Sequence, residues 1–313
     1  MAQPSETFDT YDSIGEREDL SDVIYNISPT DTPFLSSAAK TQATAVLHEW
    51  QTDSLAAAVT NNAVIEGDEA TADAVTATTR LSNSSQILDK VVTITGTQEA
   101  VDKAGRASEI AYQIAKKAKE LKRDLESSLT SNNAEVTGSA STARQLGGLG
   151  SWVATNDVFG SGGASGGLGN TARTNGTQRA FTEAQLKSVI KSVWNAGGNP
   201  QIIMVGPFNK QKLSGFTGNS TRFDAGADAT LYTSVDVYAS DFGQTQVIPN
   251  RFSRDRDGWV LDMDYWGVAF LRDFSMHELA KTGDTEKRQL LVECTLESRN
   301  EGASGLIADL TTS

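Results

Sequence analysis

Asp262 and Asp264 have the spacing in this chain that most resembles a catalytic pair. If the strand suggested by Val260 and Leu261 continues through them, both carboxylates point to one face, where they could act as general acid and base or hold Mg²⁺. No third ligand and no basic clamp for a phosphate lies nearby in the sequence. We therefore interpret the two residues as exposed turn residues of an acidic protein.

Three further features could carry chemistry, and each has a simpler explanation. His277 could be a general base, but no Ser or Cys motif accompanies it, so a structural or surface role is favoured. Cys294 falls on the apolar row of a strand and is predicted to be a small buried residue. The glycine-rich stretch 160–169 could cradle a phosphate, but no Lys-Ser or Lys-Thr pair completes a P-loop, so an extended flexible region is expected. The sequence therefore predicts no enzyme and no cofactor.

The composition limits the function classes further. The 313 residues carry a formal charge of -13, which disfavours a surface that grips phosphates through clustered Lys and Arg. One Cys and two His exclude a disulfide framework and a His/Cys metal site. The start of the chain resembles no signal peptide, and no apolar window is long enough to span a membrane. We expect a protein made and used in a cytoplasm-like compartment.

The first 92 residues are expected to form an arm and a hairpin. Residues 1–40 are predicted to be an arm with one short helix, because apolar residues recur at helical spacing over 20–27 before two prolines interrupt them. Residues 41–92 show alternation at 44–50 and 87–91, which predicts two long strands joined by a loose acidic tip. Such a hairpin has too few large side chains for its own core, so it needs a neighbour.

A long helix and an α/β unit follow. The helix is predicted over about 98–131, where apolar residues repeat at steps of three and four, giving roughly 45 Å of length. A second helix begins at Thr182, with Gln185 placed to complete a capping box. Strand and helix signals then alternate through residue 271.

The closing segment is predicted to be an ordered strand. From Leu290 to Glu297, apolar residues alternate with a largely acidic row. A charged turn precedes the strand, with Gly283 and Asp284 as turn formers.

Four strings carry a resemblance to one family. In chain order, they resemble the major capsid proteins of tailed bacteriophages with the Hong Kong 97 fold, specifically the branch similar to the phage SU10 major head protein. The strings are NISPTDTPFLSS (Asn26–Ser37), FTEAQLKSVIKSVWNAGGNPQIIMVGPFNKQKLSGF (Phe181–Phe216), DVYASDFGQTQVIPNRF (Asp236–Phe252) and LAKTGDTEKRQLLVECTLESRNEGASGLIADL (Leu279–Leu310).

The resemblance implies an α+β capsid fold with four parts. These are an N-terminal arm (1–40), an extended β-hairpin loop (41–92), a peripheral domain with the spine helix (93–180 and 272–313) and an α/β axial domain (181–271). By analogy with the family, axial domains meet at the centres of pentamers and hexamers, and the extended loop lies over a neighbouring subunit. The closing strand is then expected to return to the peripheral domain, near the long helix, at the subunit's assembly edge.

The function implied is a major capsid protein that self-assembles into the icosahedral head shell around phage double-stranded DNA. The alternatives are an encapsulin-like shell of a cellular nanocompartment, and a carboxylate-dependent hydrolase using Asp262 and Asp264. Some relatives cross-link through a Lys on the extended loop, but residues 41–89 contain no Lys, so we expect non-covalent assembly. The expected partners are other copies of the chain, a separate scaffolding protein, a portal and a decoration protein. Assembly is expected in the host bacterial cytoplasm, giving a virion component.

Charged residues in exposed turns are the candidate assembly contacts. Interleaved acids beside the arginines of 251–257 predict ion pairs within the subunit or across an interface. We also expect the acidic subunit to repel DNA that slides past the inner face of a shell. The candidate contacts are Glu66, Asp68, Glu69, Arg251, Arg254, Arg256, Lys281, Asp284 and Lys287.

Overall fold

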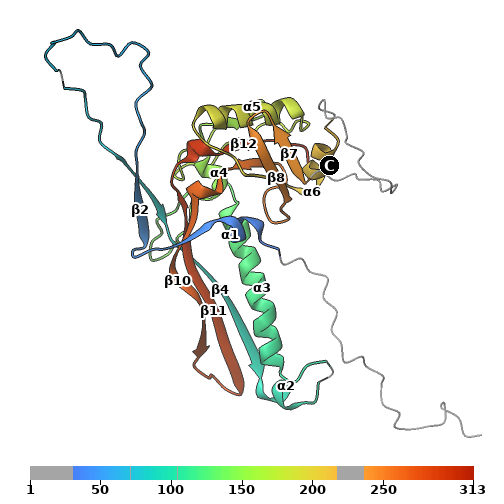
Figure 1. Ribbon diagram of the computed structural model, residues 1–313. Helices are drawn as coiled ribbons and strands as arrows, with labels where there is room; N and C mark the ends of the chain where they lie inside the picture. Colours follow the sequence, from blue (N-terminus) through green and yellow to red (C-terminus); the bar gives the residue numbers. More distant parts are fainter. Residues whose placement is uncertain (1–30, 71, 104, 217–235) are drawn as a thin grey trace, which may run out of the picture.

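The subunit consists of two sheet-containing bodies and a projecting hairpin (Figure 1). The structure is a computed structural model that describes residues 31–70, 72–103, 105–216 and 236–313. The arm helix expected at 20–27 lies outside these residues. Helices and strands both contribute, in agreement with the predicted α+β class. Among the residues described, no helix is both long and apolar enough to cross a membrane.

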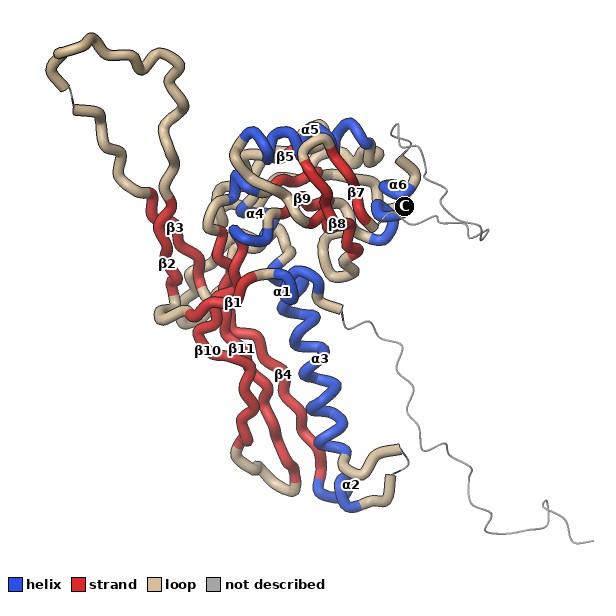
Figure 2. Tube along the Cα trace, in the orientation of Figure 1, coloured by secondary structure: helices blue, strands red, loops and turns tan. Residues whose placement is uncertain are grey.

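The first body is a four-stranded sheet packed against the longest described helix (Figure 2). The strand order is β1 (Ala39–Gln42), β10 (Trp266–Leu279), β11 (Thr285–Ser298) and β4 (Gln86–Thr95). β1 pairs parallel with β10, and the other pairs are antiparallel. The closing strand therefore returns to the long helix, as predicted, because α3 (Glu109–Leu129) contacts both β4 and β11.

The predicted helix 98–131 is wrong in its extent. The structure has α2 (Gly96–Ala100), then an interruption, then α3, whose 21 residues span about 32 Å. The two helices start separately because Thr95 caps one and Ser108 caps the other. Glu99 of α2 also accepts a hydrogen bond from the backbone N–H of Glu109 at 3.0 Å, so α2 helps to cap the N-terminus of α3.

The second body is a six-stranded sheet covered by helices. Its order is β5 (Asp157–Val158), β12 (Gly305–Ile307), β9 (Gly258–Leu261), β6 (Ile202–Val205), β8 (Gly243–Pro249) and β7 (Val237–Ser240). Helix α5 (Glu183–Asn195) buries its apolar face on this sheet, and its capping box of Thr182 and Gln185 is present as predicted. The remaining elements are α1 (Pro33–Ser37), α4 (Leu149–Trp152), α6 (Pro207–Ser214), η1 (Met263–Tyr265) and η2 (Glu301–Ala303).

This sheet corrects the predicted division at residue 271. Residues 272–313 were assigned to the body with the long helix, but β12 pairs with β9 and β5 in the six-stranded sheet. β5 also comes from the range 93–180, which was assigned to the other body. Because these are two- and three-residue strands, their alternation is too short to reveal which sheet they join.

The hairpin is shorter than predicted and uses a different second strand. β2 (Leu47–Thr52) pairs antiparallel with β3 (Thr79–Ser84), whereas the predicted partner 87–91 belongs to β4 of the four-stranded sheet. The chain passes from one sheet to the other at Ser85, whose N–H bonds to the carbonyl of Val46. Between β2 and β3, the described residues 53–70 and 72–78 form a long loop away from both bodies (Figure 2).

A buried carboxylate joins the start of the described chain to both bodies. Glu126 of α3 has no exposed surface and accepts the backbone N–H groups of Phe34 and Leu35, each at 2.8 Å. The side-chain amide of Asn250, after β8, donates to the same carboxylate at 2.7 Å. Burial raises the pKa of Glu126, although the three donors oppose that rise.

Candidate assembly surfaces

The loop of the hairpin exposes apolar side chains that none of the described residues covers. Leu55 is fully exposed, Val75 is 98% exposed and Val64 is 84% exposed. A monomeric protein rarely leaves such a group uncovered, because apolar surface is stabilised by removal from water. The hairpin loop is therefore a candidate contact with another molecule.

The base of the hairpin, in contrast, is fixed to the subunit. Trp50 stacks against Trp152 with ring centroids 5.4 Å apart, and its indole N–H donates to the carbonyl of Ser298 at 2.7 Å. Buried Asn83 donates to the carbonyl of Leu296 at 2.8 Å and accepts the N–H of Gly147 at the same distance. Contacts of this kind hold β2 and β3 in place while their loop stays uncovered.

The acidic row of β11 contributes to this anchorage. Glu297 lies 3.6 Å from His48 and accepts the hydroxyl of Thr41. The contact with His48, together with Arg299 and Thr41, lowers the pKa of Glu297 to about 2 despite its partial burial. The predicted alternation is correct, but the acidic row does not face solvent.

Glu293 binds a second set of partners on the same row. Only 3% of its surface is exposed, and it pairs with Arg144 and Arg272, each at 2.7 Å. Ser85, at the passage between the two sheets, donates to it at 2.9 Å. The sequence showed the acidic residues, but no pattern in it indicated which basic residues would pair with them.

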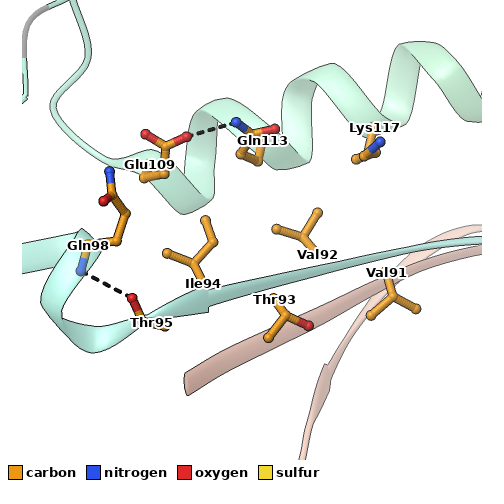
Figure 3. Close-up of a pocket in the computed structure, with 9 residues that line it drawn as sticks. All are labelled: Val91, Val92, Thr93, Ile94, Thr95, Gln98, Glu109, Gln113 and Lys117. Carbon is orange, nitrogen blue, oxygen red and sulfur yellow. Dashed lines mark hydrogen bonds between the residues drawn. The ribbon is translucent and has the colours of Figure 1, made fainter. Parts of the chain in front are cut away.

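A cleft of about 510 Å³ lies between β4 and α3 (Figure 3). Val92 and Ile94 project from β4 toward the helix, which supplies Gln113 and Lys117 to the opposite wall. Glu109 accepts a hydrogen bond from Gln113 at 2.7 Å along that wall. The lining combines apolar and polar groups, and no nucleophile in it contacts a base. The cleft is therefore better suited to bind side chains of another polypeptide than to catalyse a reaction.

The predicted contacts at the hairpin loop and at the closing turn lie at separate places. Glu66, Asp68 and Glu69 lie in the loop between β2 and β3. Lys281 and the neighbouring turn join β10 to β11, at the opposite end of the molecule (Figure 1).

At the closing turn, Lys281 and Lys287 have local side-chain contacts, and Asp284 is held through its backbone. Lys281 pairs with Glu286 at 3.6 Å, and Lys287 donates to the hydroxyl of Thr282 at 2.5 Å. The carbonyl of Asp284 accepts the N–H of Gly96 at 3.1 Å, which ties the turn to α2. The turn is thus held against the subunit while its outer surface remains exposed.

The three arginines of 251–257 differ from one another. Arg251 is exposed. Arg254 pairs with Asp257 at 3.1 Å, and Arg256 pairs with Asp309 at 2.7 Å, so two of the three are engaged inside the subunit.

The structure also reveals a buried charge cluster that sequence reasoning missed. Arg173 has a fully buried side chain that contacts Asp257 at 2.6 Å and Asp309 at 3.5 Å. Asp309 has a positive φ of 60°, a conformation that Asp tolerates better than most residues. The alternation of Arg and Asp in 251–257 was a correct signal for ion pairs, but Arg173 and Asp309 had no such pattern around them.

The aspartates considered as a catalytic pair make hydrogen bonds within the fold. Asp262 is 3% exposed, which corrects the expectation of an exposed turn, and it accepts the N–H groups of Asn199 and Asp264. Exposed Asp264 accepts from Gln201. In the described residues, no group of three His, Cys, Asp or Glu side chains is placed to hold a metal.

The other features considered for chemistry are His277, Cys294 and the glycine-rich stretch. His277 is exposed on β10 and contacts Ser275. Cys294 is buried as predicted, and burial raises its thiol pKa to about 12. The glycine-rich stretch is packed, in contrast to the flexible region expected: a Cβ at Gly169 would lie 2.7 Å from the buried ring of Trp152. Its positive φ of 89° and its close approach to a buried side chain both require a glycine at this position.

Comparisons with known proteins place the chain among viral shell proteins. The model of the family described as SU10 major capsid protein matches residues 3–311. The major capsid protein of Escherichia phage Phieco32 is 30% identical over 345 residues, covering 98% of this chain and 97% of the relative. The capsid asymmetric unit of cyanophage A-1(L) superimposes with a TM-score of 0.66 at 13% identity, covering 97% of this chain and 98% of that one.

A cellular shell protein shares the fold at a greater distance. The holo-SrpI encapsulin complex of Synechococcus elongatus PCC 7942 gives a TM-score of 0.54 at 12% identity, covering 96% of this chain and 94% of that one. At these identities the structural likeness concerns the fold alone.

Proposed function

This chain belongs to the SU10 major capsid protein family, and from that premise we propose how its surfaces build a shell. It is the major capsid protein of a tailed phage, has the Hong Kong 97 fold and forms the head shell of the virion. The proposal is that the hairpin loop of each copy lies on a neighbouring copy and that pentamers and hexamers form by such non-covalent contacts. The bodies built on the six-stranded and four-stranded sheets act as the axial and peripheral domains.

The observation that carries this proposal is the difference between the two ends of the hairpin. Its base is anchored by Trp50 and Asn83, while Leu55, Val64 and Val75 at the loop are uncovered. Burying each of these apolar side chains on another copy would contribute about 1.5–3 kcal/mol. A fixed base with an apolar end is suited to reach a neighbour without disturbing the fold of its own subunit.

Deleting residues 56–76 tests the proposal. Thr52 and Thr79 remain paired across the hairpin, and the five remaining residues 53–55 and 77–78 are enough to join the two strands. We expect a folded, soluble subunit that forms no closed shells in negative-stain electron microscopy. A full-length variant with Leu55, Val64 and Val75 each changed to Ser should show the same defect. Normal particles from the deletion would refute the role of the loop.

The charged contacts can be tested separately from the apolar ones. We propose that Glu66, Asp68 and Glu69 pair with bases of a neighbour, so E66Q/D68N/E69Q should weaken assembly without altering subunit stability. The measurement is the critical concentration for shell formation by light scattering. An unchanged critical concentration would show that the acidic end is only a solvated loop.

The closing turn and Arg251 are proposed as further contacts. Lys281 and Asp284 are exposed in the turn between β10 and β11, and half-buried Lys287 follows at the start of β11. Reversing Lys281 to Glu should raise the critical concentration of assembly. Exposed Lys191 on α5 provides a matched control, because K191E makes the same charge change elsewhere. Arg254 and Arg256 are engaged inside the subunit, so their substitution should lower subunit stability in addition to any effect on assembly.

The proposed partners beyond other copies are a separate scaffolding protein, a portal and a decoration protein, with assembly in the host bacterial cytoplasm. Double-stranded DNA would be enclosed without sequence-specific binding, which suits a chain of formal charge -13. Co-expression with and without neighbouring phage genes, followed by sedimentation of the particles, tests each partner. Regular closed shells from this chain alone would remove the need for a scaffold.

The two alternative functions receive less support. The encapsulin resemblance is one of fold alone, whereas the family model and the curated relative both describe phage capsid proteins. The role of a capsid protein is structural, and we propose that the chain has no catalytic activity, because Asp262 uses its carboxylate to accept backbone N–H groups. A turnover that disappears in Asp264→Ala, with the fold intact, would contradict that proposal.

A further inference from the structure

One face of α3 is basic although the chain as a whole is strongly acidic. Exposed Lys116, Lys119 and Lys122 follow one another at steps of three, with half-buried Arg123 beside them. Glu126 continues the same face, since Lys122 and Lys119 precede it by four and seven residues. The face therefore leads directly to the carboxylate that holds α1.

The acids of α3 do not neutralise these bases in direct pairs. Glu120 pairs with Lys117 at 2.6 Å, and Asp124 pairs with Lys90 of β4 at 2.5 Å. Among the described residues, no carboxylate lies within the 4.0 Å of an ion pair from Lys116, Lys119 or Lys122. Three lysine side chains thus lie on one face of the helix without an ion-pair partner among the described residues.

The residues that precede α1 have the complementary charge. Residues 1–30 contain seven Asp or Glu and a single Arg, a formal charge of -6. Four of these acids fall within residues 16–22, in the order Glu16, Glu18, Asp19 and Asp22. This is a local excess of charge opposite in sign to the face of α3.

The acidic N-terminal segment joins the described chain close to the basic face of α3. Thr32 and Lys122 line the same groove of about 600 Å³, and Glu126 holds the backbone of Phe34 and Leu35. From Glu126 back to Lys116 is ten residues, or about 15 Å along the helix. The nine residues from Asp22 to Asp31 can span up to about 30 Å, so the acidic run can reach the whole basic face.

We propose that the N-terminal segment of the same chain docks its acidic residues 16–22 along this face of α3. Attachment at Thr32 keeps the acidic run at a high effective concentration beside the lysines, so even weak individual ion pairs add up to preferential docking. Docking also screens a positive surface that would otherwise attract the phosphates of nucleic acid. The proposal goes beyond the shell-forming role and does not depend on which contacts join the subunits.

Trypsin offers a direct measurement, because Arg17 is the only Lys or Arg before Lys40. Docking of residues 16–22 should protect the bond after Arg17 in the nuclease-treated, full-length subunit. In K116E/K119E we expect cleavage there to be roughly fivefold faster, and added NaCl should accelerate cleavage of the wild type but not of the variant. The matched control K191E/K212E changes the charge equally on exposed lysines of α5 and α6 and should cleave at the wild-type rate.

Carbodiimide cross-linking, which joins a lysine amine to a carboxylate in contact, provides a second measurement. In a mixture of normal and ¹⁵N-labelled subunits, mass spectrometry should find links from Lys116, Lys119 or Lys122 to residues 16–22 within chains of one label. Links between differently labelled chains would overturn docking within one chain. Equal cleavage rates in the wild type and K116E/K119E, with both folded by circular dichroism, would overturn the proposal. So would protection that appears only when short duplex DNA is added.

Discussion

Replacing Glu126 tests whether one buried carboxylate joins the start of the described chain to both bodies. Its two oxygens accept three donors, from Phe34, Leu35 and Asn250. In Glu126→Gln, the amide oxygen can still accept the donors on one side of the former carboxylate, but the new NH₂ group must face at least one N–H donor. A buried donor left without an acceptor costs about 1–3 kcal/mol, so we expect that loss in the free energy of unfolding. Glu126→Ala abandons all three donors and should cost about 3–5 kcal/mol.

The assay is urea unfolding of the unassembled subunit at a fixed protein concentration. Glu120→Gln is the matched control, because Glu120 lies on the same helix, is half-exposed and pairs with a single lysine. That change should cost under about 1 kcal/mol. A Glu126→Gln variant as stable as Glu120→Gln would refute the argument that the three donors depend on this carboxylate.

The pH dependence supplies an independent check. Burial raises the pKa of Glu126 above its ordinary value of 4.5, so the folded state holds this proton more tightly than the unfolded state does. The stabilisation from that proton is complete below about pH 4.5 and disappears as the pH rises through the higher folded pKa. The difference in unfolding free energy between the wild type and Glu126→Gln should therefore change across that window and be constant above it. A flat difference from pH 4 to pH 8 would contradict the raised pKa.

Three more outcomes are expected. Glu297, with its pKa lowered to about 2, contributes stability above pH 4.5 that is lost as the pH falls toward 2, so urea unfolding of Glu297→Gln should be less pH-dependent than the wild type in that range. Cys294, whose burial raises its pKa to about 12, should react with a thiol reagent only after unfolding; rapid labelling of the native subunit would show that β11 opens. Gly169→Ala should lower the unfolding free energy by about 2–4 kcal/mol, because a Cβ would meet Trp152, whereas Gly67→Ala, with open space around it, should cost about 1 kcal/mol. Equal losses at the two glycines would indicate that backbone conformation alone sets the cost.

Local signals in the sequence predicted the elements whose stabilising contacts are also local. The capping box at Thr182 and the apolar repeat of α5 are contained within a few residues, so the helix could be predicted with its correct start. The alternation of β11 likewise depends only on its own residues. The family resemblance then supplied the fold that these elements share, which the comparisons confirm.

Features that depend on distant partners could not be predicted in the same way. β3 has the polar sequence TRLSNS, whereas 87–91 alternates more clearly, so the pattern favoured the wrong strand for the hairpin. Asn83 compensates for that polar sequence through hydrogen bonds to Gly147 and Leu296, which no local rule anticipates. Glu126 had the appearance of one more charged residue on a helix surface, because its partners lie about ninety and more than one hundred and twenty residues away.

The strand order of the four-stranded sheet has a consequence for synthesis of the protein. Ala39 of β1 pairs with Gly267, and Thr95 of β4 pairs with Thr285, so the first strands made must wait for the last long strands. At a translation rate of about 5–20 residues per second, the delay is on the order of 10–40 s. During that time a nascent chain lacks the sheet that supports α3 and the base of the hairpin. The four-stranded sheet can therefore form only when the chain is almost complete, so an unfinished chain cannot present the same surfaces as a finished subunit.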